Sequence, residues 1–289
     1  MTRDLRIVDV FTDRALSGNQ LAVVLDGRGL TTELMQKIAR EMNFSETTFV
    51  LPPDDSAHAA RVRIFTPGSE LPFAGHPTIG TAWVLHDEGR TVGLEFVLEE
   101  GVGPVPVRGV RDGTRVRFWM SHPQLVFGEV VEARREFANA IGLAADDLQP
   151  GVPIQSATTG VPFLYAAVRD LDTVDRATRG TFGPAHQPAF IFAVAGPGRL
   201  YSRMFAGDGL SIGEDPATGS ASGPLGAFAV KCGLVARAPK VSIVSEQGTK
   251  MGRQAFIHIE LTYGESVDIP EQIEVGGGVM PVVKGALAQ

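Results

Sequence analysis

Short runs of branched and apolar residues, separated by turn-forming residues, recur along the chain and predict a protein dominated by β-strands. In residues 60–66, apolar Val62 and Ile64 alternate with arginines, which is typical of a strand with one face toward solvent. The predicted strands cover residues 5–11, 21–25, 47–51, 60–66, 94–98, 105–110 and 116–120 in the first half, and 163–168, 189–194, 200–205, 241–244, 255–261 and 279–283 in the second.

Four helices are predicted among these strands. Leu34, Ile38 and Met42 recur every four positions and form a helical stripe. Pro77 suits the first turn of another helix, because its missing N–H would have no partner there in any case. The predicted helices cover residues 32–42, 78–86, 130–141 and 218–232. Many strands with one central and one peripheral helix in each half indicate an α+β fold with mostly antiparallel pairing.

Two segments about 140 residues apart look alike and indicate that the two halves share one plan. Residues 73–80 and 214–221 each place polar residues, a proline and glycine directly before or at the start of a predicted helix. We therefore expect two lobes, residues 1–124 and 125–289, with room for the last strand to cross back to the first lobe. A small-molecule site is expected where the halves face each other, with Asp215 in the place that matches His76.

Composition narrows the class of protein. The 289 residues are 44% hydrophobic and 20% charged, so the chain can bury a large core. The formal charge of −7 argues against a nucleic-acid or anionic-membrane surface, and no run reaches the roughly 18 apolar residues of a membrane span. A start without the apolar core of a signal peptide and a single cysteine, Cys232, fit a reducing cytoplasm.

Several motifs that resemble known sites are interpreted as turns or packing features. Residues 209–213 match a Gly-x-Ser-x-Gly pattern but do not follow a buried strand of a parallel sheet. The glycines at 276–278 lack the spacing of a nucleotide-binding loop, and the six histidines show no metal-ligand spacing. We expect neither a metal nor a cofactor.

Glu46 is the strongest candidate for chemistry. It lies at a predicted helix-to-strand junction among residues that look buried, so its carboxylate would lose hydration. Desolvation moves the pKa of a glutamate toward neutrality, where one side chain can both accept and return a proton. A surface or turn-capping glutamate is the alternative.

Polar residues at two helix starts are the other candidates. His76 directly precedes Pro77, where helix N–H groups favour an anion and an imidazole could donate or shuttle a proton. Asp215 could be an ordinary capping residue, and its functional interpretation depends on its pairing with His76. Backbone N–H groups and hydroxyls that could hold a substrate carboxylate are expected from Gly75, Thr218, Gly219 and Ser220.

Together, seven segments resemble the phenazine-biosynthesis PhzF-like family. They are residues 9–11 (DVF), 17–20 (SGNQ), 39–50 (AREMNFSETTFV), 63–67 (RIFTP), 70–77 (ELPFAGHP), 202–205 (SRMF) and 214–221 (EDPATGSA). The resemblance implies a diaminopimelate-epimerase-like fold, with two similar lobes that each wrap a mixed sheet around a central helix, and a homodimer.

The resemblance also implies an activity. The best-understood members are isomerases of trans-2,3-dihydro-3-hydroxyanthranilate that need neither cofactor nor metal, in which the glutamate matching Glu46 moves a proton between ring carbons. Positions matching Gly75, His76, Asp215 and Ser220 contact substrate or assist the transfer there, and we add Asn19 and Ser45 from the same motifs. Gln20 stands where proline is common. Related epimerases use a cysteine pair where this chain has Ala74-Gly75 and Asp215, so a two-thiol mechanism cannot operate.

We therefore expect a cofactor-independent isomerase that acts on a small carboxylated, cyclic or amino-acid-like substrate, with Glu46, His76 and Asp215 as catalytic residues. Two alternatives stay open. The protein could be an epimerase or racemase of an amino or hydroxy acid, or a binder of a small metabolite without catalysis. Fold resemblance does not transfer a substrate.

Overall fold

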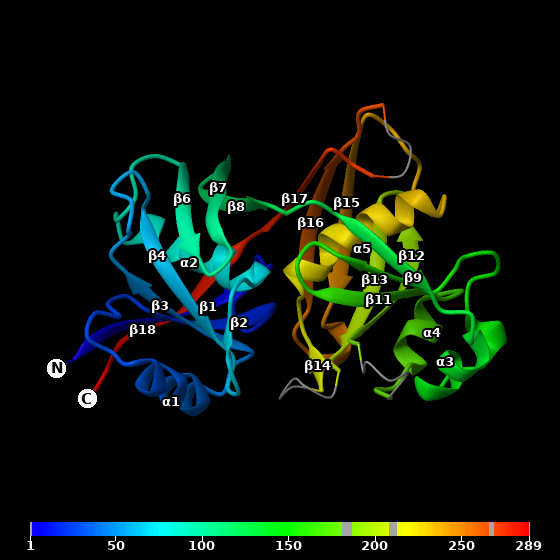
Figure 1. Cartoon of the computed structure of the whole chain (residues 1–289), viewed down its shortest axis with the longest axis horizontal. Helices are drawn as coiled ribbons and strands as arrows, with labels where there is room; N and C mark the ends of the chain where they lie inside the picture. Colours follow the sequence, from blue (N-terminus) through cyan, green and yellow to red (C-terminus); the bar gives the residue numbers. More distant parts are fainter. Residues whose placement is uncertain (1, 181–186, 208–212, 266–268, 289) are drawn as a thin grey trace. The chain divides into compact units, whose positions relative to one another are not determined.

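The computed structural model describes residues 2–180, 187–207, 213–265 and 269–288. The chain divides into two compact units (Figure 1). Unit 1 comprises Met1–Ser121 together with Gly276–Gln289, and unit 2 comprises His122–Val275. The C-terminal strand thus belongs with the N-terminal half of the chain.

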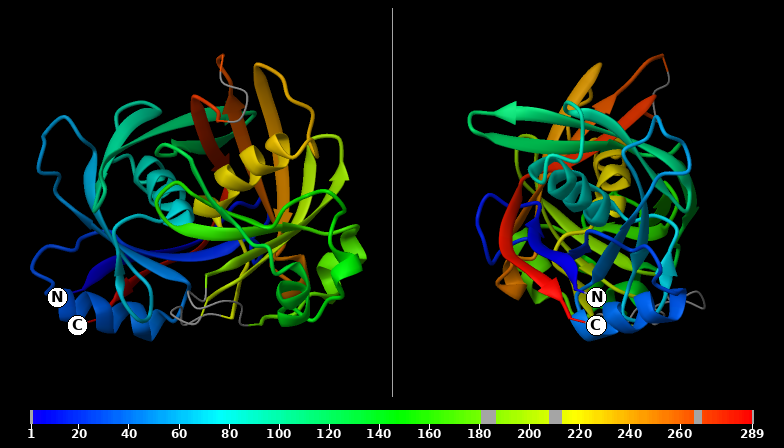
Figure 2. Two further views of the ribbon diagram at one scale, coloured as in Figure 1. Left: turned by 45° about the vertical axis from the view of Figure 1, so that its right-hand side comes forward. Right: turned by 90° about the vertical axis from the view of Figure 1, so that its left-hand side faces the viewer.

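Unit 1 is a mixed, mostly antiparallel sheet. Its strands are β1 (Arg3–Val10), β2 (Asn19–Val24), β3 (Glu46–Leu51), β4 (Ala60–Phe65), β5 (Glu70–Leu71), β6 (Glu95–Glu100), β7 (Gly103–Asp112), β8 (Arg115–Ser121) and β18 (Val279–Leu287). They pair in the order β18-β1-β2-β3-β4-β6-β7-β8, with β5 added to β4. The β2–β3 and β4–β6 pairs are parallel and the others antiparallel. In both views of Figure 2 the two chain ends lie side by side, as the β1–β18 pairing requires.

Two helices cover this sheet in different ways. Helix α1 (Thr32–Met42) has the predicted bounds, begins at a Thr31 cap and ends at Asn43 in the left-handed conformation. Its buried stripe is Met35, Ile38 and Ala39, while the predicted stripe residue Leu34 is 38% exposed. Helix α2 (Gly75–Asp87) is buried on nearly every side and contacts β1, β2, β3 and β8, so it is the central helix of the unit.

Unit 2 repeats this architecture. Its strands are β9 (Val126–Val130), β10 (Gln155–Thr158), β11 (Pro162–Ala167), β12 (Ala189–Gly196), β13 (Arg199–Phe205), β14 (Glu214–Asp215), β15 (Lys240–Gln247) and β16 (Ala255–Thr262), and β17 (Gln272–Gly277) crosses the division between the units. The helices are α3 (Arg134–Ala140), α4 (Leu171–Arg176) and α5 (Gly219–Lys231), with single turns η1 (Ala145–Asp147) and η2 (Thr249–Met251). Helix α5 is almost entirely buried and contacts β10, β11 and β16.

The internal repeat extends to the order of the strand pairs. From β1 to β7 the pairs run antiparallel, parallel, antiparallel, parallel and antiparallel, and from β10 to β16 they run in the same order. The peripheral helices α1 and α4 follow the matching strands β2 and β11, and a central helix of 13 residues follows the two-residue strand of each unit. The predicted α+β class with two similar lobes is confirmed.

An ion pair that occurs in both units shows which of their residues correspond. Arg63 donates two hydrogen bonds of 2.7 Å to Glu70, and Arg203 donates two of 2.8 Å to Glu214. In each unit the glutamate lies opposite a phenylalanine, Phe65 or Phe205, that the arginine also covers. Arg63 therefore corresponds to Arg203, and Glu70 to Glu214.

Some predicted elements differ from the structure. The helix predicted over 130–141 is only α3, because residues 126–130 pair with β10 as a strand. Strands β5, β9, β10, β14 and β17 and helix α4 were absent from the prediction. These are short segments, in which periodicity has too few positions to separate a strand or helix from a turn.

Candidate active site

The residue at the start of β3 is Glu46. The left-handed cap at Asn43 ends α1, and Phe44 and half-buried Ser45 lead directly into the strand. Glu46 lies opposite Leu21 in the parallel β2–β3 pair, and its side chain is 15% exposed. The carboxylate is therefore mostly withdrawn from solvent but not sealed off.

His76 contacts Glu46 from the first turn of α2. Its Nε2 atom lies 3.5 Å from Glu46 Oε2 and 3.3 Å from the carbonyl oxygen of Gln20. Its Nδ1 atom lies 3.2 Å from Nδ2 of Asn19, which is buried at the start of β2. An amide nitrogen is a donor only, so Nδ1 must accept and the proton sits on Nε2. The imidazole thus directs its N–H toward Gln20 and Glu46.

The imidazole of His76 is neutral. It is 4% exposed, and burial lowers its pKa to about 3, although the hydrogen bond to Gln20 acts in the opposite direction. Desolvation disfavours the charged ring more than this contact favours it. The close approach of His76 and Glu46 is therefore a contact between a neutral N–H donor and a carboxyl group, not a salt bridge.

The first turns of both central helices offer backbone N–H groups. Ala74, at the N-cap of α2, has no polar side chain, and the first turn holds no acidic residue. Thr218, at the N-cap of α5, donates its hydroxyl to Asp215 at 2.6 Å instead of accepting from its own helix. Gly75 and Gly219 begin the two helices. Such helix starts favour anions.

Asp215 lies in a hydrogen-bonded cluster within unit 2, together with Thr218 and Gln247. It is 6% exposed, and besides Thr218 its neighbour is Gln247, whose amide donates to the Asp215 carbonyl at 2.8 Å and to the Thr218 hydroxyl at 3.0 Å. The Gln247 side-chain oxygen accepts from the Thr218 backbone N–H at 3.1 Å. Gln247 was not predicted, because a single glutamine at the end of a strand carries no sequence signature.

The predicted match between His76 and Asp215 is wrong. The helices begin at Gly75 and Gly219, so His76 corresponds to half-buried Ser220. Asp215 lies opposite Met204, where unit 1 places Leu71 opposite Ile64. The error comes from aligning the two prolines: Pro77 is inside the first turn of its helix, whereas Pro216 precedes the helix.

The structure thus brings Asn19, Glu46 and His76 together in unit 1, with Ser45 and Gly75 next to them in the chain. In unit 2 it brings together Asp215, Thr218 and Gln247, with Gly219 and Ser220 at the helix start. Residues 209–212 of the Gly-x-Ser-x-Gly segment lie outside the described residues. The thiol of Cys232 lies at the C-cap of α5, the opposite end from Thr218, and burial raises its pKa.

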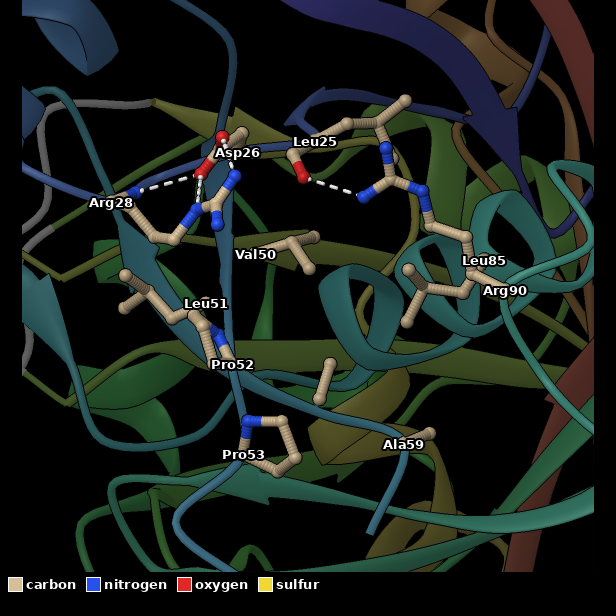
Figure 3. A pocket seen from close by; sticks show the side chains of 11 residues that line it. Leu25, Asp26, Arg28, Val50, Leu51, Pro52, Pro53, Ala59, Leu85 and Arg90 are labelled. Carbon is tan, nitrogen blue, oxygen red and sulfur yellow. Dashed lines mark hydrogen bonds and ion pairs between the residues drawn. The ribbon is translucent and has the colours of Figure 1, made fainter. Parts of the chain in front are cut away.

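Other features of the described residues add no second site. No three or more His, Cys, Asp or Glu side chains among them lie close enough to hold a metal ion. None of the described helices is both long and apolar enough to cross a membrane. A hollow of about 240 Å³ lies at the far end of β3 from Glu46, around Val50 and Leu51 (Figure 3). Its arginines are engaged, Arg28 with Asp26 and Arg90 with the carbonyl of Leu25.

Comparisons with known proteins agree with this architecture. The family model described as phenazine biosynthesis-like protein matches residues 8–285. The trans-2,3-dihydro-3-hydroxyanthranilate isomerase of Pseudomonas aeruginosa is 34% identical over 96% of this chain and 97% of its own length. A crystal structure of a PhzF-family phenazine biosynthesis protein from Bacillus anthracis is 27% identical, covers 100% of both chains and superimposes with a TM-score of 0.89.

A second solved structure is similar over nearly its full length. It is described as a predicted epimerase from Pseudomonas aeruginosa, is 33% identical, covers 99% of both chains and has a TM-score of 0.82. With the family model matched over almost the whole sequence and a curated relative above 30% identity, the chain belongs to the phenazine biosynthesis-like PhzC-PhzF family.

Proposed function

We propose that this protein is a cofactor-independent isomerase that moves a proton between carbon atoms of a small carboxylated substrate, cyclic or amino-acid-like, with Glu46 as the acid and base. The isomerase class is supported by the curated relative in Pseudomonas aeruginosa, whose name specifies an isomerase. The choice of substrate class follows from that relative and from the two uncapped helix starts, which suit an anionic group.

The observation that carries the proposal is the contact of Glu46 with His76. A single carboxyl group can take a proton from one carbon and return it to another if it is partly desolvated and close to a neutral donor. Glu46 is 15% exposed, and its Oε2 atom lies 3.5 Å from Nε2 of His76. His76 would orient the carboxylate or donate to a substrate oxygen, and Asn19 holds the ring in the required tautomer.

The residues of unit 2 are assigned to substrate binding and proton relay. Asp215 is fixed by the hydroxyl of Thr218, and Gln247 holds the backbone on either side. Gly219 and Ser220 present N–H groups and a hydroxyl at the start of α5. We assign Asn19, Ser45 and Gly75 to substrate binding in unit 1.

The experiment is proton exchange in D₂O. The protein is incubated with cyclic amino acids, including dihydrohydroxyanthranilate, and products are analysed by mass spectrometry and NMR. Deuterium at a new carbon with a shifted double bond supports the proposal. Deuterium at one stereocentre with inversion would identify an epimerase instead, a reaction that the similar predicted epimerase also brings into consideration. A ligand that binds but returns without deuterium would identify a binder.

The location and assembly are part of the same proposal. We place the enzyme in the cytoplasm as a homodimer, on the basis of its single cysteine and of the family resemblance. Light scattering after size-exclusion chromatography tests the assembly, because a dimer has twice the 30.7 kDa mass of the chain. A mass of one chain contradicts it.

A further inference from the structure

The hydroxyl of Thr78, in the first turn of α2, contacts two oxygen atoms. It lies 2.8 Å from the carbonyl oxygen of Ala74 and 2.6 Å from Oε1 of Glu100, at the end of β6. A hydroxyl carries one hydrogen and can donate to only one of them. With an ionised Glu100, one short contact would therefore join two oxygens with no proton between them.

Unit 2 shows which contact the hydroxyl makes. Ser222 occupies the place of Thr78 and donates to the Thr218 carbonyl at 2.8 Å, just as Thr78 lies 2.8 Å from that of Ala74. Because the bond to the carbonyl recurs in both helices, the proton in the other contact must come from Glu100.

The residue of unit 2 that matches Glu100 carries an amide side chain in place of a carboxyl group. In the parallel pairs, Arg61 lies opposite Glu99 and Tyr201 lies opposite Glu246. Since Arg63 corresponds to Arg203, Arg61 corresponds to Tyr201, and the next residues along, Glu100 and Gln247, correspond to each other. Gln247 donates to the N-cap threonine of its central helix without carrying charge. A neutral carboxylic acid is the nearest equivalent that a glutamate can offer.

The surroundings of Glu100 disfavour a negative charge on its carboxyl group. The residue is 7% exposed, and among the described residues its Oε2 atom has no hydrogen-bond partner. Burial raises the pKa of Glu100 to about 8, although the contact with the Thr78 hydroxyl acts in the opposite direction. A buried carboxylate without compensating bonds is costly, so the proton is retained.

The charged groups around Glu100 are engaged elsewhere. An open hollow of about 540 Å³ beside it is lined by Arg61, Arg63 and Glu70. Arg63 is held by Glu70, and Arg61 lies 3.2 Å from Asp54. On the same strand, Glu99 pairs with His58. In the described part of the chain, the neighbouring elements add no charge at this point, because the His76 ring on α2 is neutral and β7 places Gly103 opposite Glu100.

We propose that Glu100 is a protonated positioning residue, whose carboxylic acid donates to Thr78 while Thr78 donates to the Ala74 carbonyl, so that one chain of hydrogen bonds fixes the first turn of α2. That turn carries Gly75 and His76. When Glu100 loses its proton at alkaline pH, its carboxylate and the Thr78 hydroxyl oxygen are left in contact without a proton between them. The first turn of α2 then shifts and displaces His76. The consequence for catalysis rests on the proposed function, whereas the protonation state does not.

Thermal unfolding tests the proton directly. Because Glu100 keeps its proton up to about pH 8 when folded, but only to about pH 4.3 when unfolded, it contributes stability that is lost as pH rises between these values. The E100Q variant retains a donor and cannot titrate. We expect the difference in Tm, E100Q minus wild type, to grow from about pH 5 to about pH 8 and then to level off. A difference that is constant with pH overturns the proposal.

The adjacent glutamate provides the matched control. Glu99 accepts hydrogen bonds from the backbone of Asp54 and Asp55, which lower its pKa to about 2. Its contribution is lost only as pH falls, so the E99Q difference should not change above about pH 5.

Imidazole NMR of His76 tests the positioning role without any substrate. Because the pKa of His76 is about 3, its ring does not titrate near neutrality. Its resonances should nevertheless shift with a midpoint near that of Glu100 in the wild type, and stay constant in E100Q. Constant resonances in the wild type overturn the positioning role. If E100Q does not fold, the ¹³C shift of the Glu100 carboxyl in the wild type reports the same midpoint, and a midpoint near the ordinary value of about 4.3 overturns the proposal.

Discussion

Glu46 Oε2 and His76 Nε2 lie 3.5 Å apart, yet the imidazole is not protonated. A neighbouring carboxylate ordinarily favours the imidazolium form. Here burial dominates and lowers the pKa of His76 to about 3. The site therefore combines a base with a neutral donor, an arrangement that can transfer a proton and also stabilise a developing negative charge.

Replacing Glu46 by glutamine should remove the proton carrier and leave the fold intact. Positioned acid and base catalysis contributes about 10² to 10⁴-fold, so turnover by E46Q should fall by about this factor. Deuterium incorporation should fall in parallel. The exposed Glu41 on α1 provides the control, since E41Q keeps the site unchanged. Full activity in E46Q would assign the reaction to another group.

The neutral state of His76 should appear in the pH dependence of stability. Its pKa is about 3 when folded and about 6.5 when unfolded, so the stability it contributes is full above about pH 6.5 and is lost as pH falls toward 3. Relative to H76Q, the wild type should lose up to about 1.4 kcal/mol of unfolding free energy per pH unit in this range. Urea denaturation between about pH 4 and pH 8 measures it. Parallel curves for the two proteins would contradict the buried neutral ring.

Asn19 should determine which ring nitrogen of His76 carries the proton. Its amide N–H groups leave Nδ1 as an acceptor at 3.2 Å. In N19D, a carboxylate accepts from Nδ1–H and should raise the pKa of His76 by about one to three pH units. Imidazole ¹⁵N shifts distinguish the tautomers, with N19S as a control that adds no charge. An unchanged tautomer in N19D would show that Gln20 alone orients the ring.

The two matched ion pairs should differ in their contribution to stability. Arg203 and Glu214 are 11% and 18% exposed, and Arg203 also donates to carbonyls of Val174, Asp175 and Ala177. Breaking a buried pair by removing one partner costs about 3–5 kcal/mol, so R203M should approach this loss. Arg63 and Glu70 are 25% and 38% exposed, and R63M should cost about 1 kcal/mol or less. Urea denaturation measures both losses of unfolding free energy. Equal losses in R203M and R63M would mean that burial does not determine how much each ion pair contributes.

Sequence patterns predicted the long elements because those elements have enough positions to show a period. Helix α1 was placed with its observed bounds. The stripe within it was less accurate, because Leu34 is apolar and yet exposed while the small Ala39 faces the core. Helix α4 has six residues and β14 has two, too few for any period to stand out.

The sequence identified the candidate site residues one by one, but it did not predict the contacts between them. Asn19, Glu46 and His76 come from three separate segments, and only the fold shows that Asn19 controls the histidine. Pro77 and Pro216 look equivalent because proline is tolerated both in a first helical turn and in the extended chain before it. Glu100 ends a strand as a charged residue would at a surface, so nothing in the sequence indicates that it is buried.

Strand β18 pairs along β1, from Val279 opposite Val10 to Leu287 opposite Arg3. During synthesis on the ribosome, β1 therefore cannot complete its pairing until β18 has been synthesised. Unit 2, which is continuous, can complete its core while the N-terminal segment still has one open edge. Nascent chains that stop before residue 279 should expose β1 to aberrant strand pairing, which makes premature termination a route to aggregation for this protein.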